Sequence, residues 1–153
     1  MAGKVLVDTN VLLYAYDRSN PVKQPQAVAV LDRLATKRLG VLTAQVLAEF
    51  FFNAIRKLKP PMTAEQAYSR IQNYLLAWEV LDVTGAMVLE AARGVRDHQL
   101  AYWDAQIWAT ARLNQISFVL SEDFSNGTVI EGVRFVDPFA SDFDLDDWLL
   151  SQG

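Results

Sequence analysis

Four acidic residues stand where a carboxylate could face a binding site: two follow strand-like runs and two lie on helices with apolar faces. They are Asp8, Glu49, Asp104 and Asp123. The chain has no cysteine and a single histidine, so a metal site built from these acids would offer oxygen ligands only. Oxygen ligands suit hard cations such as Mg²⁺ or Mn²⁺. Such an ion can neutralise phosphate charge, lower the pKa of a bound water and stabilise a leaving oxygen. The four acids therefore predict metal-assisted chemistry at a phosphate group.

Asp8 and Asp123 occupy equivalent places in the predicted sheet. Asp8 closes the apolar run 4–7, and Asp123 lies just after the run 117–120. Ligands of open α/β sheets bind beyond the carboxyl ends of the strands, so the two carboxylates meet at one edge if these strands are neighbours. Carboxylates that repel one another in a dry cleft would have raised pKa values without a metal. The alternative is that each acid caps a helix or turns a loop, which is common for Asp.

Asp104 shares a helix face with apolar residues. Positions three, four and seven further on are Ile107, Trp108 and Ala111, which should point inward. A buried carboxylate without a partner is costly and normally needs a cation or hydrogen bonds. The alternative is an ordinary first-turn acid, stabilised by the helix dipole.

Glu49 belongs to a polar stripe on an otherwise apolar helix. The stripe repeats at four-residue intervals through Gln45, Glu49, Asn53 and Lys57. It either lines a polar cleft or is simply solvated, and the helix alone does not decide between the two interpretations.

Strands and helices alternate along the chain and must position these acids. Short apolar runs predict five strands, at 4–7, 41–43, 79–83, 117–120 and 134–136. Helical spacing predicts helices at 11–16, 23–38, 44–58, 63–76, from 84 onward, and at 103–114. Gly40 is expected to stop the second of these helices, and Thr63 with Gln66 forms a capping box for the fourth. The alternation predicts a three-layer α/β/α fold around a mostly parallel five-stranded sheet.

Composition bounds the remaining possibilities. The 153 residues fit one domain, which we expect to span 1–140, with an acidic and aromatic extension at 141–153. Apolar residues make up 52% of the chain, but no run approaches the roughly 18–20 apolar residues of a membrane span. The absence of cysteine and of a signal-peptide pattern fits a reducing cytoplasm. The net charge of −4 argues against a nonspecific nucleic-acid binder, and the surplus of apolar residues suggests a partner or a self-interface.

Several other residues admit two interpretations. The basic cluster Arg56, Lys57 and Lys59 could contact an RNA backbone, although such a run is more often a solvated helix end. The four tryptophans are expected in the core or at an interface, and Trp103, next to Asp104, is the best candidate for base stacking. His98 is expected at a helix end or on the surface and is not assigned as a base.

The ordered set of acidic motifs resembles that of PIN-domain nucleases over nearly the whole chain. The segments that carry the resemblance are 5–12 (VLVDTNVL), 46–50 (VLAEF), 102–105 (YWDA), 120–124 (LSEDF) and the closing 136–139 (VDPF). Each motif alone is weak, but their order along the chain is specific. Within the family the chain looks most like the VapC-type toxins of type II toxin–antitoxin pairs.

This resemblance implies a metal-dependent ribonuclease that hydrolyses phosphodiester bonds in single-stranded RNA. It also implies Mg²⁺ or Mn²⁺ as the cofactor, a homodimer, and a cognate antitoxin that blocks the site. The acidic quartet carries over as Asp8, Glu49, Asp104 and Asp123, which would coordinate the metal and orient the attacking water. Thr9 would be a supporting hydroxyl near Asp8, Asn10 would orient the first turn, and Asn126 stands where some relatives place a further polar or acidic group.

Three other functions compete with this interpretation. A phosphatase with an aspartyl nucleophile usually carries a second acid two residues on, where this chain has Asn10. A signalling receiver domain needs paired acids after the first strand and a lysine after the last, and this sequence supplies neither. A catalytically silent PIN-like binding scaffold is disfavoured because all four acids are present, and a metal titration followed by an RNA-cleavage assay would separate it from an enzyme.

Overall fold

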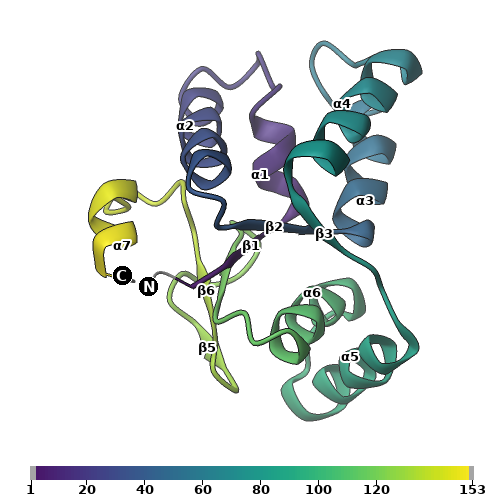
Figure 1. The fold of residues 1–153 in the computed structure, drawn as a ribbon, viewed down its shortest axis with the longest axis vertical. Coiled ribbons are helices and arrows are strands. Elements are labelled where there is room, and N and C mark those ends of the chain that lie inside the picture. The colour runs from purple at the N-terminus through teal and green to yellow at the C-terminus, as the bar shows by residue number, and fades with distance from the viewer. Residues whose placement is uncertain (1–2, 152–153) are drawn as a thin grey trace.

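A six-stranded sheet forms the centre of the molecule in the computed structural model, which describes residues 3–151 (Figure 1). Its strands are β1 (Val5–Val7), β2 (Gly40–Thr43), β3 (Glu79–Leu81), β4 (Phe118–Leu120), β5 (Val129–Ile130) and β6 (Val133–Val136). The helices are α1 (Thr9–Tyr14), α2 (Lys23–Thr36), α3 (Ala44–Ala54), α4 (Ala64–Ala77), α5 (Gly85–His98), α6 (Tyr102–Leu113) and α7 (Leu145–Ser151). Helices α1–α4 lie on one side of the sheet, and α5 and α6 lie on the other (Figure 1). The predicted three-layer α/β fold is therefore confirmed.

The strand order β3-β2-β1-β4-β6-β5 places β1 between β2 and β4. Both neighbours run parallel to β1, and Val7 pairs with Leu120 at the end of β4. Asp8 and Ser121 therefore leave the sheet side by side, and the Asp8 N–H donates to the Leu120 carbonyl across 2.9 Å. This register brings the carboxyl ends of β1 and β4 to one edge of the sheet, where a ligand site is expected.

The predicted count of five strands is wrong by one, because the two-residue strand β5 pairs antiparallel with β6. The hairpin turns through Glu131 and Gly132, which both have positive φ angles, of 46° and 85°. Two left-handed residues in succession form the tight turn that matches the twist of a hairpin. A strand this short has no hydrophobic period of its own, so only its pairing with β6 reveals it.

The predicted helices all form, with shifted ends. The expected stop at Gly40 is wrong: α2 ends at Thr36, and Arg38 adopts the left-handed conformation with φ at 55°. Gly40 lies instead in β2, where an added Cβ would stand 2.1 Å from the Trp78 ring. Helix α3 ends four residues before the predicted 58. The capping box of Thr63 and Gln66 is confirmed at the start of α4.

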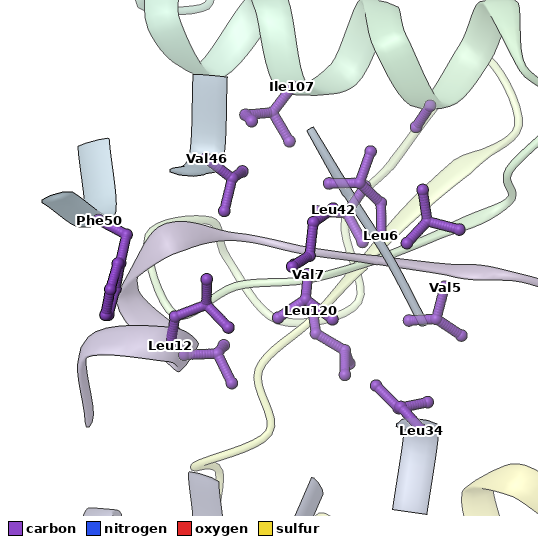
Figure 2. Close-up of a cluster of buried hydrophobic side chains, with 14 of the residues drawn as sticks. Val5, Leu6, Val7, Leu12, Leu34, Leu42, Val46, Phe50, Ile107 and Leu120 are labelled. Atoms are coloured by element: carbon purple, nitrogen blue, oxygen red, sulfur yellow. The ribbon is translucent and has the colours of Figure 1, made fainter. Parts of the chain in front are cut away.

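The core lies on both faces of β1, β2 and β4 (Figure 2). Its largest fully buried side chains include Trp108, Phe50, Phe135, Leu6, Leu12, Leu34, Leu42, Ile107 and Leu120. Strands buried on both faces need continuous apolar runs, which explains why β1 is Val-Leu-Val without alternation. This packing holds the strand ends rigidly, so the side chains that follow them are positioned by the core. Residues 3–151 contain no helix with the length and apolar character of a transmembrane span.

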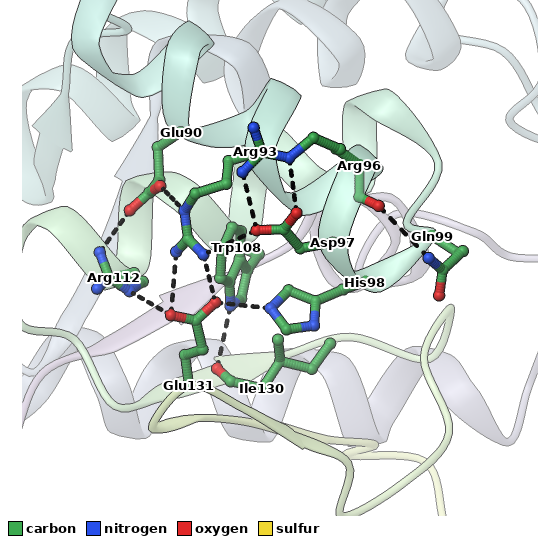
Figure 3. A network of polar contacts seen from close by, with 10 residues as sticks. All are labelled: Glu90, Arg93, Arg96, Asp97, His98, Gln99, Trp108, Arg112, Ile130 and Glu131. Atoms are coloured by element: carbon green, nitrogen blue, oxygen red, sulfur yellow. Dashed lines mark hydrogen bonds and ion pairs between the residues drawn. The ribbon is translucent and has the colours of Figure 1, made fainter.

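A network of ion pairs fastens the β5–β6 turn to α5 and α6 (Figure 3). Arg93 bridges Glu90 on its own helix to Glu131 in the turn, and Arg112 of α6 contacts the same two acids. His98, the last residue of α5, bonds Glu131 across 2.6 Å. The hydrogen bonds from Arg93 and then His98 lower the pKa of Glu131 to about 2. His98 thus has a structural partner at a helix end, as its position in the sequence suggested.

Helix α7 packs beside the sheet next to β4. The Trp148 ring lies edge-on to Phe118 at 5.4 Å between centroids and to Phe143 at 6.0 Å. Asp146 forms an ion pair with Arg33 of α2. The described part of the acidic and aromatic tail is therefore folded onto the rest of the chain. Residues 1–2 and 152–153, at the outer ends of the predicted segments 1–140 and 141–153, lie outside the described part.

Gly94 of α5 offers a test of the packing between α5 and α6. Glycine inside a helix normally costs about 1 kcal/mol relative to alanine. A Cβ at Gly94, however, would lie 2.8 Å from the Trp108 ring, which is fully buried. We expect Gly94→Ala to destabilise the fold by about 1–3 kcal/mol because the added methyl overpacks the core. Urea denaturation measures this change. Gly85→Ala, in the same helix with open space around it, is the matched control, and equal stability of the two variants would contradict the packing argument.

Candidate metal-binding site

Asp8 is the most buried of the four acids, with 5% of its surface exposed. It leaves β1 as the N-cap of α1, and its Oδ1 accepts a hydrogen bond from the Thr9 N–H at 2.8 Å. Its Oδ2 accepts a second from the Ser121 hydroxyl at 2.8 Å. Asp8 therefore does cap a helix, as the alternative interpretation held, but capping employs only one of its two oxygens.

Asn10 links Asp8 to the end of β4. Its amide Nδ2 lies 3.4 Å from Asp8 Oδ2, 3.1 Å from Ser121 Oγ and 3.2 Å from Asp123 Oδ2. The Ser121 hydroxyl also accepts from the Asp123 N–H at 3.1 Å. The two acids at the ends of β1 and β4 are thus joined through one amide and one hydroxyl. This meeting follows from the parallel pairing of the two strands.

Glu49 approaches the same edge from α3. Its Oε2 accepts from the Thr9 hydroxyl at 3.2 Å, and its Oε1 accepts from Gln45 Nε2 at 2.8 Å. Gln45 is buried, whereas Glu49 and Asn53 are half-buried. The polar stripe therefore starts inside the molecule at Gln45 and only reaches solvent further along α3, so its first part lines a cleft.

Asp104 lies in the first turn of α6, half-buried above residues that the sequence placed inward. Ile107, Trp108 and Ala111 are all buried, which confirms the predicted face. Across residues 3–151, no hydrogen bond or ion pair is found for the Asp104 carboxylate. It instead interacts electrostatically with Asp123 and Glu49. A carboxylate without a hydrogen-bond or ion-pair partner and with acidic neighbours can accept a cation.

The four acids share one electrostatic environment. Burial raises the pKa of Asp8 to about 7, and the charges of Asp123 and Glu49 add to this rise. Burial also raises the pKa of Asp104, again with contributions from Asp123 and Glu49. Within the described part of the chain, no Lys or Arg forms an ion pair with any of the four. Negative charge is thus gathered at one edge of the sheet without a protein cation to balance it, which favours an added cation.

The donor set fits a hard divalent ion in its chemistry, since it is made of carboxylate oxygens with hydroxyl and amide support. The spacing is looser than coordination requires. Among residues 3–151, no group of three or more His, Asp or Glu side chains already stands at metal-ligand separation. Mutual repulsion of like charges gives a physical reason for this separation.

Asn126 and Trp103, the next candidates from the sequence, have different surroundings in the structure. The side chain of Asn126 accepts a hydrogen bond from the Asp137 N–H at 3.0 Å and lines a pocket with Asp142 and Phe143 of the tail. Among the described residues, no hydrogen bond links Asn126 to the quartet. Trp103 is 63% exposed, which excludes a core position for this tryptophan and leaves an interface or base stacking.

The basic cluster lies near the end of α3. Lys57 lines a pocket that also includes Asn10, and the Arg56 guanidinium lies 4.1 Å from the centre of the Phe52 ring. Lys59 is exposed. Lys57 therefore shares a pocket with Asn10, whereas Arg56 lies against the exposed Phe52 ring of α3.

The sequence did not identify two residues of the site. Ser121 joins Asp8 to Asp123, and Gln106 forms a buried amide pair with Gln45 behind Glu49. The Ser-x-Asp spacing after β4 was a usable signal for Ser121, because a serine two residues before an acid can bond its backbone. Gln106 carried no such signal, since its partner is 61 residues away along the chain.

Comparisons with known proteins agree with the α/β fold of the chain. The family model of the PIN domain matches residues 5–125. A search of curated proteins found no match. Among solved structures, a toxin–antitoxin complex from Klebsiella pneumoniae aligns with a TM-score of 0.65 at 18% identity, covering 88% of this chain and 98% of that one. The sarcin–ricin loop cleaving toxin VapC20 of Mycobacterium tuberculosis aligns with a TM-score of 0.64 at 20% identity, covering 86% and 99%.

A third solved structure, the DNA-bound VapBC complex of Salmonella typhimurium, aligns with a TM-score of 0.63 at 16% identity, covering 89% of this chain and 98% of that chain. At such low identity these likenesses establish the fold. The family model spans all four acids, from the end of β1 to the loop after β4. The chain therefore belongs to the PIN-domain family.

Proposed function

We propose that this chain is a metal-dependent endoribonuclease that hydrolyses phosphodiester bonds in single-stranded RNA. The observation that carries the proposal is the gathering of Asp8, Glu49, Asp104 and Asp123 at one edge of the sheet, without an ion pair to a Lys or Arg among the described residues. Cleavage of a phosphodiester requires balancing charge on the phosphate and activating a water, and clustered carboxylates serve both needs when they hold a divalent ion.

Each residue has a role that its contacts support. The four carboxylates would hold Mg²⁺ or Mn²⁺, which supplies Lewis-acid stabilisation of the phosphate and acidifies a water. Asn10 and Ser121 keep Asp8 and Asp123 aligned, and Thr9 holds Glu49 against α1. Asp104 has no competing hydrogen bond in the described structure, so its oxygens are free to orient the attacking water. Asn126 stays a more distant support, through the backbone of Asp137.

We further propose that the protein is the toxin of a toxin–antitoxin pair, acts in the cytoplasm, forms a homodimer and is inhibited by an antitoxin. The structural neighbours described above support the pairing with an antitoxin. Exposed apolar side chains support protein partners as well, since Leu76 of α4 is 87% exposed and Leu89 of α5 is 77% exposed. In this proposal residues 1–140 form the nuclease domain and 141–153 its extension.

Cleavage of a fluorescent single-stranded RNA by the purified chain tests the central proposal. We expect cleavage with Mg²⁺ or Mn²⁺, none after chelation with EDTA, and recovery when either ion is restored in excess. The metal dependence follows because the site supplies negative charge that no Lys or Arg among residues 3–151 pairs with. An RNA duplex of the same sequence is the control for strand preference. Cleavage that persists in EDTA would refute the metal role, and no cleavage with any ion would favour a silent binding scaffold.

A further inference from the structure

An open pocket lies between α3 and the start of α6, directly beside Glu49. Its volume is about 860 Å³, within the ~300–1,000 Å³ range typical of ligand pockets. Phe52, Trp103 and Val83 supply apolar lining, and Asn53 adds a polar side chain to it. Glu49 belongs both to this pocket and to the acidic quartet, so a ligand in the pocket would adjoin the proposed reaction centre.

The two aromatic walls are unusually exposed for their size. The Trp103 side chain is 63% exposed and Phe52 is 52% exposed. Arg56 lies over the Phe52 ring at 4.1 Å from its centre, and Tyr102 supports Trp103 edge-on at 5.0 Å. A large exposed apolar surface marks an interaction site, and aromatic rings pair favourably with other aromatic groups by stacking.

The floor of the pocket is a relay of buried amides. Tyr102 OH donates to Gln106 Oε1 at 2.9 Å, and Gln106 Nε2 donates to Gln45 Oε1 at 2.8 Å. Gln45 Nε2 in turn bonds Glu49 Oε1 at 2.8 Å and the Trp103 carbonyl at 3.1 Å. Gln45 and Gln106 are 8% and 5% exposed. These hydrogen bonds fix the position of the Trp103 backbone relative to the Glu49 carboxylate.

We propose that this pocket is a base-binding subsite: Trp103 and Phe52 stack on a nucleobase of single-stranded RNA that flanks the phosphate held at the quartet. The inference rests on the proposed ribonuclease function. Unpaired bases stack on exposed aromatic side chains and on arginine, which are the groups gathered here. Gln45 and Gln106 are positioning residues, because they orient Trp103 and Glu49 and are themselves buried. The subsite thus sets which phosphate reaches the acids.

An abasic scan of a bound RNA tests the subsite. Eight-nucleotide single-stranded RNAs, each lacking one base, are titrated by fluorescence anisotropy against Asp104→Asn protein with Mg²⁺, so that the RNA stays intact. We expect one abasic position to weaken binding about 10-fold, as loss of a stacked base does. Trp103→Ala should weaken binding of the complete RNA by a similar factor. The affinity of this variant should then be the same for the complete RNA and for the RNA that lacks that base. Phe52→Ala should show the same pattern, and Trp103→Phe should retain most of the affinity.

Controls separate this inference from its rivals. Leu89→Ala removes an apolar side chain on α5 that is more exposed than Trp103 or Phe52, and it should leave the scan unchanged. Sedimentation velocity on the same samples monitors assembly. A Trp103→Ala variant that dissociates a dimer while keeping the abasic profile of the parent would overturn the subsite in favour of a protein interface. A parent profile that is flat at every position would overturn it as well.

Failure of the base-binding subsite can be distinguished from failure of the proposed ribonuclease function. If the unsubstituted chain cuts RNA but Trp103→Ala and Phe52→Ala leave kcat/KM within about twofold of its value, the subsite fails and the nuclease stands. If the chain shows the abasic profile but never cuts, the subsite stands and the nuclease fails. Absence of both RNA binding and cleavage removes both proposals.

Discussion

Asp104→Asn is expected to lower RNA cleavage by about 10³-fold, equivalent to roughly 4 kcal/mol of transition-state stabilisation. The substitution removes one of the negative charges that would bind the metal but keeps the shape of the side chain. Because no hydrogen bond or ion pair holds the Asp104 carboxylate within residues 3–151, the fold loses nothing by the change. Burial and the charges of Asp123 and Glu49 raise the pKa of Asp104, so removing its charge relieves repulsion.

The variant should therefore be inactive and yet at least as thermostable as the unsubstituted chain without metal. Multiple-turnover cleavage assays at saturating Mg²⁺ measure the first effect, and thermal denaturation in EDTA measures the second. Asp32→Asn, an exposed acid on α2, is the isosteric control and should change neither quantity. Full cleavage by Asp104→Asn would remove this carboxylate from the reaction, and lower stability would show that it has a structural partner.

The second large effect concerns stability in the absence of metal as a function of pH. Burial raises the pKa of Asp8 from 3.8 to about 7 in the folded chain. Between these values the unfolded chain has released the proton that the folded chain still holds, so raising the pH favours unfolding. Neutral Asp8 contributes fully to the free energy of unfolding below pH 4, and this contribution is lost as the pH rises to 7. Its full size is about 4 kcal/mol.

Asp8→Asn isolates this contribution, because asparagine stays neutral at every pH and can still accept a hydrogen bond from Thr9 or Ser121. We expect the variant to match the unsubstituted chain near pH 4 and to exceed it increasingly up to pH 7, measured by urea denaturation in EDTA. The difference between the two proteins cancels the titration of other groups, such as Glu131. A difference that stays constant from pH 4 to 7 would show that Asp8 is ionised and otherwise stabilised. Mg²⁺ should reduce the difference by stabilising the Asp8 carboxylate.

Much of the site was predictable because its members occupy local patterns. Asp8 ends an apolar run, and Asp104 shares a helical period with Ile107 and Trp108. Periodicity and strand ends are properties of neighbouring residues, so they can be recognised before the chain is folded. The same reasoning explains the capping box at Thr63, whose two hydrogen bonds span only three residues.

Other features depend on pairs of residues far apart along the chain. Strand β5 exists only through its pairing with β6, and Gly40 is required by the ring of Trp78, 38 positions later. No local pattern encodes such a contact, since it is decided when the sheet and helices pack. The exposure of Trp103 has the same origin, because an apolar side chain looks like a core residue until the neighbours that would cover it are known.

The amino-acid sequence alone predicted the alternation of strands and helices, the buried face of α6 and four acids as candidate metal ligands. The folded chain was needed to show that β1 and β4 are neighbours, that Asn10 and Ser121 join Asp8 to Asp123, and that buried amides connect Glu49 to Trp103. The physical reason is that local preferences act within a few residues, whereas the charge density and shape of a site are sums over elements that meet only in the folded chain.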